Sequence, residues 1–111
     1  MKSELKDGVL IIPFEGSVVG AVLSADLAEL LKTNIEAGNN KVVFDMANMK
    51  YVDSTGLGMM LNAVSKLKAA GGKLVLCSVP EQMTKLLKMT KLEMAFHQQA
   101  DEAAAIAFLK A

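Results

Sequence analysis

The stretch that decides the fold reads Asp53-Ser54-Thr55-Gly56-Leu57-Gly58. It follows an apolar run of strand length over residues 41–45, and apolar side chains at helical spacing come after it. The motif therefore sits where a strand gives way to a helix. Asp and Ser are ordinary capping residues at such a junction, and glycine often marks a close approach. A phosphate on Ser54 would also be tolerated there, because free backbone N–H groups and the helix dipole favour negative charge.

The rest of the chain alternates strands with helices, which predicts an α/β fold with a mostly parallel sheet of four to five strands. Residues 3–6 and 9–14 are expected to form an N-terminal antiparallel hairpin around Asp7-Gly8. The segment from Gly16 to Gly20 is expected to be a loop. Further strands are predicted over 41–45, 73–77 and 96–98. No linker divides residues 1–111, so a single domain is expected.

About four helices are predicted. The first is capped by Ser24 and ends near Gly38, and the second runs from about 55 to 70. A capping box at 78–81 opens a third, short helix. The last covers 101–109, with Ala103, Ile106 and Leu109 facing inward.

The composition of the chain argues against several classes of function. Twelve basic and twelve acidic side chains cancel, so no basic field attracts nucleic acid or an anionic membrane. The N-terminus lacks a signal-peptide core and no apolar stretch approaches the length of about 20 residues that spans a bilayer, so a cytoplasmic protein is expected. The lone Cys77 is interpreted as a buried hydrophobe. A single histidine, His97, offers neither a metal cluster nor a catalytic set, so we expect no cofactor, no metal and no enzyme.

The order of elements, together with the motif at 53–58, resembles the STAS domain, a family that includes bacterial anti-sigma factor antagonists. The family pattern is an apolar strand, a short loop, then Asp-Ser-Ser/Thr/Ala-Gly-Leu-Gly opening a helix. Gly71-Gly72 before a hydrophobic strand, and the segment 86–92, also look like the family. The resemblance covers essentially the whole chain.

The resemblance implies a function. In the family, the serine after the Asp is phosphorylated by an anti-sigma factor that is also a serine kinase, and that role carries onto Ser54. The unphosphorylated antagonist binds the anti-sigma factor, and a metal-dependent serine/threonine phosphatase restores this form. The alternative is a STAS interaction module of another assembly, such as a stress-signalling scaffold or a lipid-transport complex.

We expect the partner to contact the motif and the next turn of the helix. This set comprises Asp53, Ser54, Thr55, Gly56, Gly58, Met59 and Asn62. Met59 falls outside the side that Leu57, Leu61 and Val64 are expected to bury, so it is predicted to be an exposed contact, with partial burial as the alternative.

One stretch departs from the family. Antagonists often carry Gly-x-Leu/Ile-Asp after the first long strand, whereas this chain has Gly16-Ser17-Val18-Val19. The acidic position is therefore the apolar Val19. We expect this loop to lie near Ser54, because both follow the same ends of neighbouring strands, so the departure bears on kinase recognition.

Overall fold

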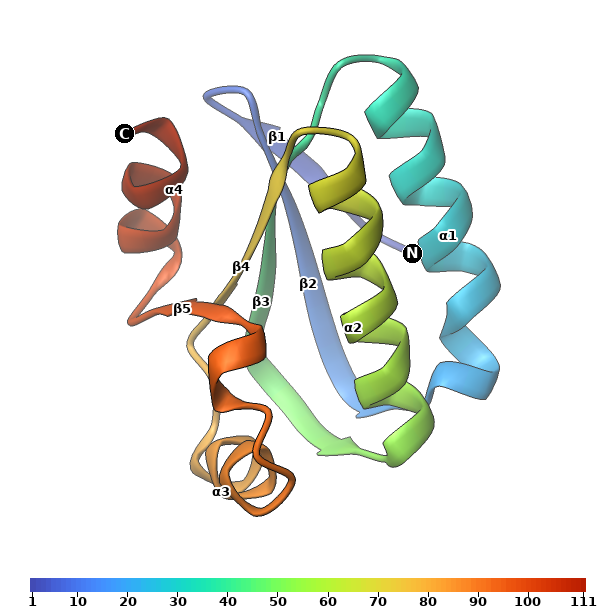
Figure 1. The fold of residues 1–111 in the computed structure, drawn as a ribbon, viewed down its shortest axis with the longest axis vertical. Helices are drawn as coiled ribbons and strands as arrows, with labels where there is room; N and C mark the ends of the chain where they lie inside the picture. Colours follow the sequence, from blue (N-terminus) through green and yellow to red (C-terminus); the bar gives the residue numbers. More distant parts are fainter.

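A computed structural model describes all 111 residues. It contains one five-stranded sheet with the strand order β1-β2-β3-β4-β5 (Figure 1). The first two strands are antiparallel and every other neighbouring pair is parallel. The strands are β1 (Glu4–Lys6), β2 (Val9–Val18), β3 (Lys41–Val52), β4 (Lys73–Cys77) and β5 (His97–Gln99). The helices are α1 (Gly20–Glu36), α2 (Ser54–Ala69), α3 (Glu81–Met89), the 3-10 turn η1 (Glu93–Ala95) and α4 (Glu102–Lys110). The predicted α/β class and parallel sheet are confirmed.

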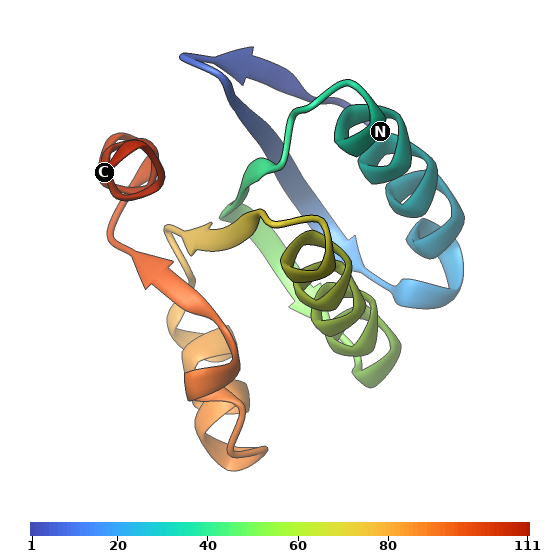
Figure 2. The same ribbon diagram turned by 45° about the horizontal axis from the view of Figure 1, so that its top comes forward.

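The sheet separates two hydrophobic cores. Helices α1 and α2 lie side by side over one face, and α4 alone covers the other (Figures 1 and 2). Alternate residues of each strand supply the two cores: Leu10 and Ile12 face α1 and α2, whereas Val9 and Ile11 face α4. The larger core holds 20 buried residues and the smaller one seven, so most of the apolar burial lies under α1 and α2. None of the helices is long and apolar enough to cross a membrane.

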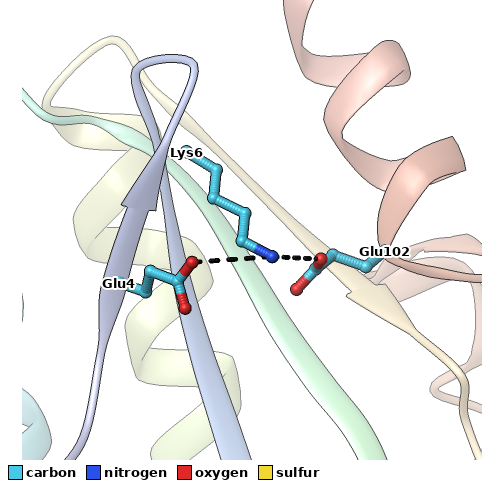
Figure 3. Close-up of polar contacts among 3 residues, drawn as sticks. All are labelled: Glu4, Lys6 and Glu102. Carbon is cyan, nitrogen blue, oxygen red and sulfur yellow. Dashed lines mark hydrogen bonds and ion pairs between the residues drawn. The ribbon is translucent and has the colours of Figure 1, made fainter.

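The N-terminal hairpin forms as predicted. Asp7 and Gly8 both have positive φ, 52° and 79°, which is the backbone that a two-residue type I′ turn requires. The hairpin also contacts α4. The Nζ atom of Lys6 lies 2.9 Å from Glu102 and 3.5 Å from Glu4 (Figure 3). The hydrogen bond from Lys6 to Glu102, more than any other interaction, raises the pKa of this lysine.

The ends of β2 and β3 differ from expectation. Parallel pairing between them continues through irregular registers until Val18 lies opposite Val52, so the predicted loop at 16–20 is mostly strand. Helix α1 starts at Gly20 rather than after Ser24, because the carbonyl of Val19 already accepts hydrogen bonds from the N–H groups of Val22 and Leu23. Pairing between distant strands, rather than local sequence, sets these boundaries.

Two local predictions are wrong. The capping box does not form, because Ser78 adopts a left-handed backbone with φ 53° and Pro80 occupies the cap of α3 without a side-chain bond. In α4, Leu109 is buried and Ile106 is half-buried as predicted, but Ala103, also predicted to face inward, is exposed and Ala105 is buried instead. Asp101, expected to be the first residue of this helix, is instead its cap, because its carboxylate accepts a hydrogen bond from Ala104 N–H at 2.8 Å.

Candidate functional site

The motif lies where two helices start together. Because β2 and β3 end side by side, α1 and α2 begin next to each other at one edge of the sheet (Figure 1). A Cβ atom added at Gly20 would overlap the carbonyl group of Thr55, and one added at Gly56 would overlap the carbonyl oxygen of Val18. The glycine of the motif is therefore a close-approach residue, and Gly20 is its counterpart on α1.

Asp53 is the cap of α2. Its Oδ1 atom accepts hydrogen bonds from the N–H of Gly56 and from the hydroxyl of Thr55, both at 2.7 Å. The hydroxyl of Thr55, followed by the N–H of Gly56, holds the pKa of the Asp53 carboxyl below its usual value. The carboxylate is therefore ionised near neutral pH and occupied in holding the first turn.

The two hydroxyl groups of the motif have different environments. Thr55 Oγ1 donates to Asp53 and also accepts from the N–H of Ala21 in α1 at 3.4 Å. Ser54, the first residue of α2, is exposed, and its hydroxyl has no hydrogen-bond partner within the chain. A second protein could thus reach the Ser54 hydroxyl without breaking an internal contact.

Two helix starts and one carboxylate determine the electrostatics around Ser54. Neither α1 nor α2 carries an acidic residue in its first turn. The partial positive charge at the start of each helix is offset only by Asp53, which precedes α2. The two helix starts would stabilise part of the charge of a phosphoryl group on Ser54, in opposition to the neighbouring Asp53 carboxylate.

No group of three or more His, Cys, Asp or Glu side chains is placed to hold a metal ion. Cys77 is buried as predicted, and burial raises the pKa of its thiol to about 11, so it is a poor nucleophile.

Comparison with known proteins matches residues 1–105 to the STAS domain model. The chain belongs to the STAS domain family. Within it, the chain is 30% identical over 103 residues to BtrV of Bordetella bronchiseptica, named as an anti-sigma factor antagonist, covering 92% of this chain and 88% of that one. It is 31% identical over 72 residues to the anti-sigma-B factor antagonist of Staphylococcus epidermidis, covering 65% of this chain and 67% of the other. It is thus a STAS domain of the anti-sigma factor antagonist family.

Solved structures show the same fold. A Thermotoga maritima protein described as an anti-sigma factor antagonist superimposes with a TM-score of 0.85 at 18% identity, covering 99% of this chain and 94% of the other. The Bacillus cell fate determinant SpoIIAA in its phosphorylated form gives a TM-score of 0.72 at 18% identity, covering 96% and 97%. The STAS fold expected from the motif at 53–58 is therefore confirmed.

Met59 corrects one expectation for this STAS domain. Its side chain is only 5% exposed, so the prediction of an exposed Met59 is wrong. Helix α2 is covered by the sheet on one side and by α1 on another. Met59 lies on the side that faces α1. By contrast Asn62 is exposed, and an added Cβ at Gly58 would meet open space. Both remain available to a partner.

The structure adds residues that were not singled out. Gly20 and Ala21 of α1 contact Thr55 directly, which confirms that the Val19 stretch lies beside Ser54. Two large apolar side chains near the motif are exposed, Val22 in the first turn of α1 at 72% and Tyr51 near the end of β3 at 55%. The signal for Gly20 was a glycine directly after a long strand. The exposure of Val22 and Tyr51 could be identified only once the residues at which α1 begins and β3 ends were known.

Proposed function

We propose that this STAS domain is an anti-sigma factor antagonist controlled by phosphorylation of Ser54. In its unphosphorylated form it binds an anti-sigma factor that is also a serine kinase. The observation that carries the proposal is the free, exposed hydroxyl of Ser54 beside a Thr55 hydroxyl that is already bonded to Asp53 and Ala21. The names of the relatives BtrV and the staphylococcal protein support the partner class.

Phosphorylation would act on binding rather than on the fold. The added charge of about −1.5 to −2 is stabilised at a helix start. On a surface that fits a neutral hydroxyl, the same charge adds desolvation cost and like-charge repulsion. The partner would therefore dissociate while the domain stays folded.

The proposed cycle needs two partners and no cofactor of its own. The kinase adds the phosphate and a serine/threonine phosphatase removes it, which places the protein in the cytoplasm where ATP is available. The proposed partner surface comprises Asp53, Ser54, Thr55, Gly58 and Asn62, whereas Gly56 and Met59, expected from the sequence to be contacts, are buried beneath it. The domain itself acts as a binding module and not as an enzyme.

The test is phosphate incorporation by the cognate kinase. Ser54→Ala should abolish labelling, while Ser65→Ala, an exposed serine on the same helix, should be labelled like the native protein. Circular dichroism should show both variants folded. Labelling that persists in Ser54→Ala, or that maps to Thr55, contradicts the assignment.

A second measurement tests the switch. The protein phosphorylated on Ser54 and the Ser54→Asp variant should both keep the native circular-dichroism spectrum and should both bind the anti-sigma factor more weakly. The aspartate effect should be the smaller one, because a carboxylate carries less charge than a phosphate. Undiminished binding by the phosphorylated protein would overturn the mechanism.

The alternative, a module of another assembly, is favoured by Val19, an apolar residue beside Ser54 where many antagonists carry an acid. Gel filtration of the native complex separates the two proposals. A pairwise complex with a kinase supports the antagonist, and a large multi-subunit particle supports the alternative.

A further inference from the structure

Two large apolar side chains are exposed close to Ser54. Val22, in the first turn of α1, is 72% exposed, and Tyr51, near the end of β3, is 55% exposed. Only six large apolar side chains of the chain are exposed at all. Two of the six therefore lie at the edge of the sheet where α1 and α2 begin.

The contact between the two helix starts holds Val22 near Ser54. The N–H of Ala21 donates to the hydroxyl of Thr55 at 3.4 Å. Val22 follows Ala21 and Ser54 precedes Thr55, and neighbouring Cα atoms of a chain are only about 3.8 Å apart. Both helices begin at the same edge of the sheet (Figure 1), and the Cα–Cβ bonds of a helix tilt toward its start. The side chains of Val22 and Ser54 are therefore presented at the same end of the molecule.

Strand pairing places Tyr51 at this end as well. Tyr51 pairs with Ser17, and the pair that follows, Val18 with Val52, is the last one between β2 and β3. Ser54 comes three residues after Tyr51, so their Cα atoms are separated by about 11 Å at most. A partner that reaches the hydroxyl of Ser54 thus comes within range of the Tyr51 ring.

The first turn of α1 offers a partner an apolar contact and no acidic one. Neither α1 nor α2 carries an acidic side chain in its first turn. The carboxylate of Asp53 already accepts hydrogen bonds from the Thr55 hydroxyl and the Gly56 N–H. Val22 is therefore the most prominent feature of the α1 start.

We propose that Val22 and Tyr51 are the apolar anchors by which the anti-sigma factor kinase recognises this domain, an inference that rests on the proposed function. A kinase that phosphorylates Ser54 must bring its surface to that hydroxyl. A specific interface buries on the order of 800 Å² per partner, which is a patch about 30 Å across. A patch of this size centred on Ser54 includes both anchors.

The anchors also make the interface sensitive to phosphorylation. Apolar side chains at an interface exclude water from the groups beside them, and a charge is costly to remove from water. A phosphoryl group on Ser54, with a charge of about −1.5 to −2, would lose hydration when the partner covered Val22 and Tyr51. The side chains that supply affinity to the unphosphorylated form therefore oppose binding of the phosphorylated form.

The decisive experiment measures affinity by calorimetry, with the purified anti-sigma factor that labels Ser54 as the probe. Val22→Ser and Tyr51→Ala should each weaken binding by roughly five- to thirtyfold, the range for an anchor residue. Val22→Ile and Tyr51→Phe keep the apolar contact and should restore most of the lost affinity. Tyr51→Ala should also reduce the ratio of affinities between the unphosphorylated and phosphorylated forms.

Leu5→Ser is the matched control. Leu5 is 52% exposed, and it pairs with Leu10, eight residues before the end of β2 and thus roughly 26 Å from it. This variant should bind like the native protein, and thermal unfolding of every variant confirms that the domain is folded. The losses from Val22→Ser and Tyr51→Ala should be equal at about 0.05 and 0.5 M salt, because screening weakens charge interactions and not apolar contacts.

The outcomes separate this inference from the proposed function. If the anti-sigma factor labels Ser54 but the Val22 and Tyr51 variants bind like the native protein, the anchors are wrong and the antagonist function stands. Losses that disappear at high salt also overturn the inference, because the variants would then act through charge. If no anti-sigma factor binds or labels the native protein, both proposals fail. A native chain that sediments as a dimer and becomes monomeric on Tyr51→Ala assigns these side chains to a second copy instead.

Discussion

Asp53 and Ser54 are adjacent residues with separate tasks. The carboxylate of Asp53 accepts hydrogen bonds from the Thr55 hydroxyl and the Gly56 N–H in the first turn of α2. The hydroxyl of Ser54 makes no hydrogen bond within the chain, and the residue is exposed. The cap is therefore built without the residue that is proposed to carry the phosphate, which lets the modification change the surface and leave the helix start intact.

Met59 gives a prediction about stability at the same scale. Met59→Ala should lower the free energy of unfolding by about 2–4 kcal/mol, because it leaves a cavity between α1 and α2. For a chain of this size that corresponds to a fall in melting temperature on the order of 10 °C. Asn62→Ala, on an exposed position of the same helix, should change the melting temperature little. A Met59→Ala variant as stable as the native protein would show that the side chain does not belong to the core.

At the scale of elements, the close contact between the starts of α1 and α2 depends on glycine. Gly56→Ala should destabilise the protein by about 1–3 kcal/mol, since the new Cβ overlaps the carbonyl oxygen of Val18. Gly58→Ala, two residues further along, meets open space and should stabilise the protein by up to about 1 kcal/mol through helix propensity. Urea denaturation of both variants measures whether each substitution raises or lowers the free energy of unfolding. Equal effects would contradict the close approach.

The elements show how far sequence reasoning reaches. The strand at 73–77 was predicted with its observed bounds, because an apolar run between Gly71-Gly72 and Ser78 marks both ends locally. The ends of β2 and β3 were not, since they depend on pairing between segments 30 residues or more apart in the sequence. Met59 was misplaced because helical spacing identifies one buried face, whereas α2 has a second face against α1. The motif identified the junction, and only the folded structure shows that Thr55 is bonded and Ser54 is free.

For the whole molecule, the smaller core decides how α4 is held. Ion pairs join Lys6 to Glu102 and Lys110 to Asp7, at either end of the helix, but all four side chains are substantially exposed. Such pairs contribute little to stability in water. Leu109 and Ala105, by contrast, are buried against Val9, Ile11 and Val43. Apolar contact therefore holds α4 against the sheet.

This ranking of contacts is testable. Leu109→Ala should lower the free energy of unfolding by about 2–4 kcal/mol and speed amide hydrogen exchange in α4. Lys6→Gln should leave the melting temperature nearly unchanged at physiological salt, where exposed charges are screened. A larger loss from Lys6→Gln than from Leu109→Ala would reverse the ranking.

Both outermost strands of the sheet, β1 and β5, are only three residues long. Each of these two strands therefore exposes few free N–H and C=O groups to a neighbouring molecule, although β1 pairs with only Val9, Leu10 and Ile11 of the longer β2. Strands this short discourage the edge-to-edge addition of strands by which amyloid fibrils grow. The outer strands β1 and β5 thus offer little backbone through which one copy of the domain could pair with another.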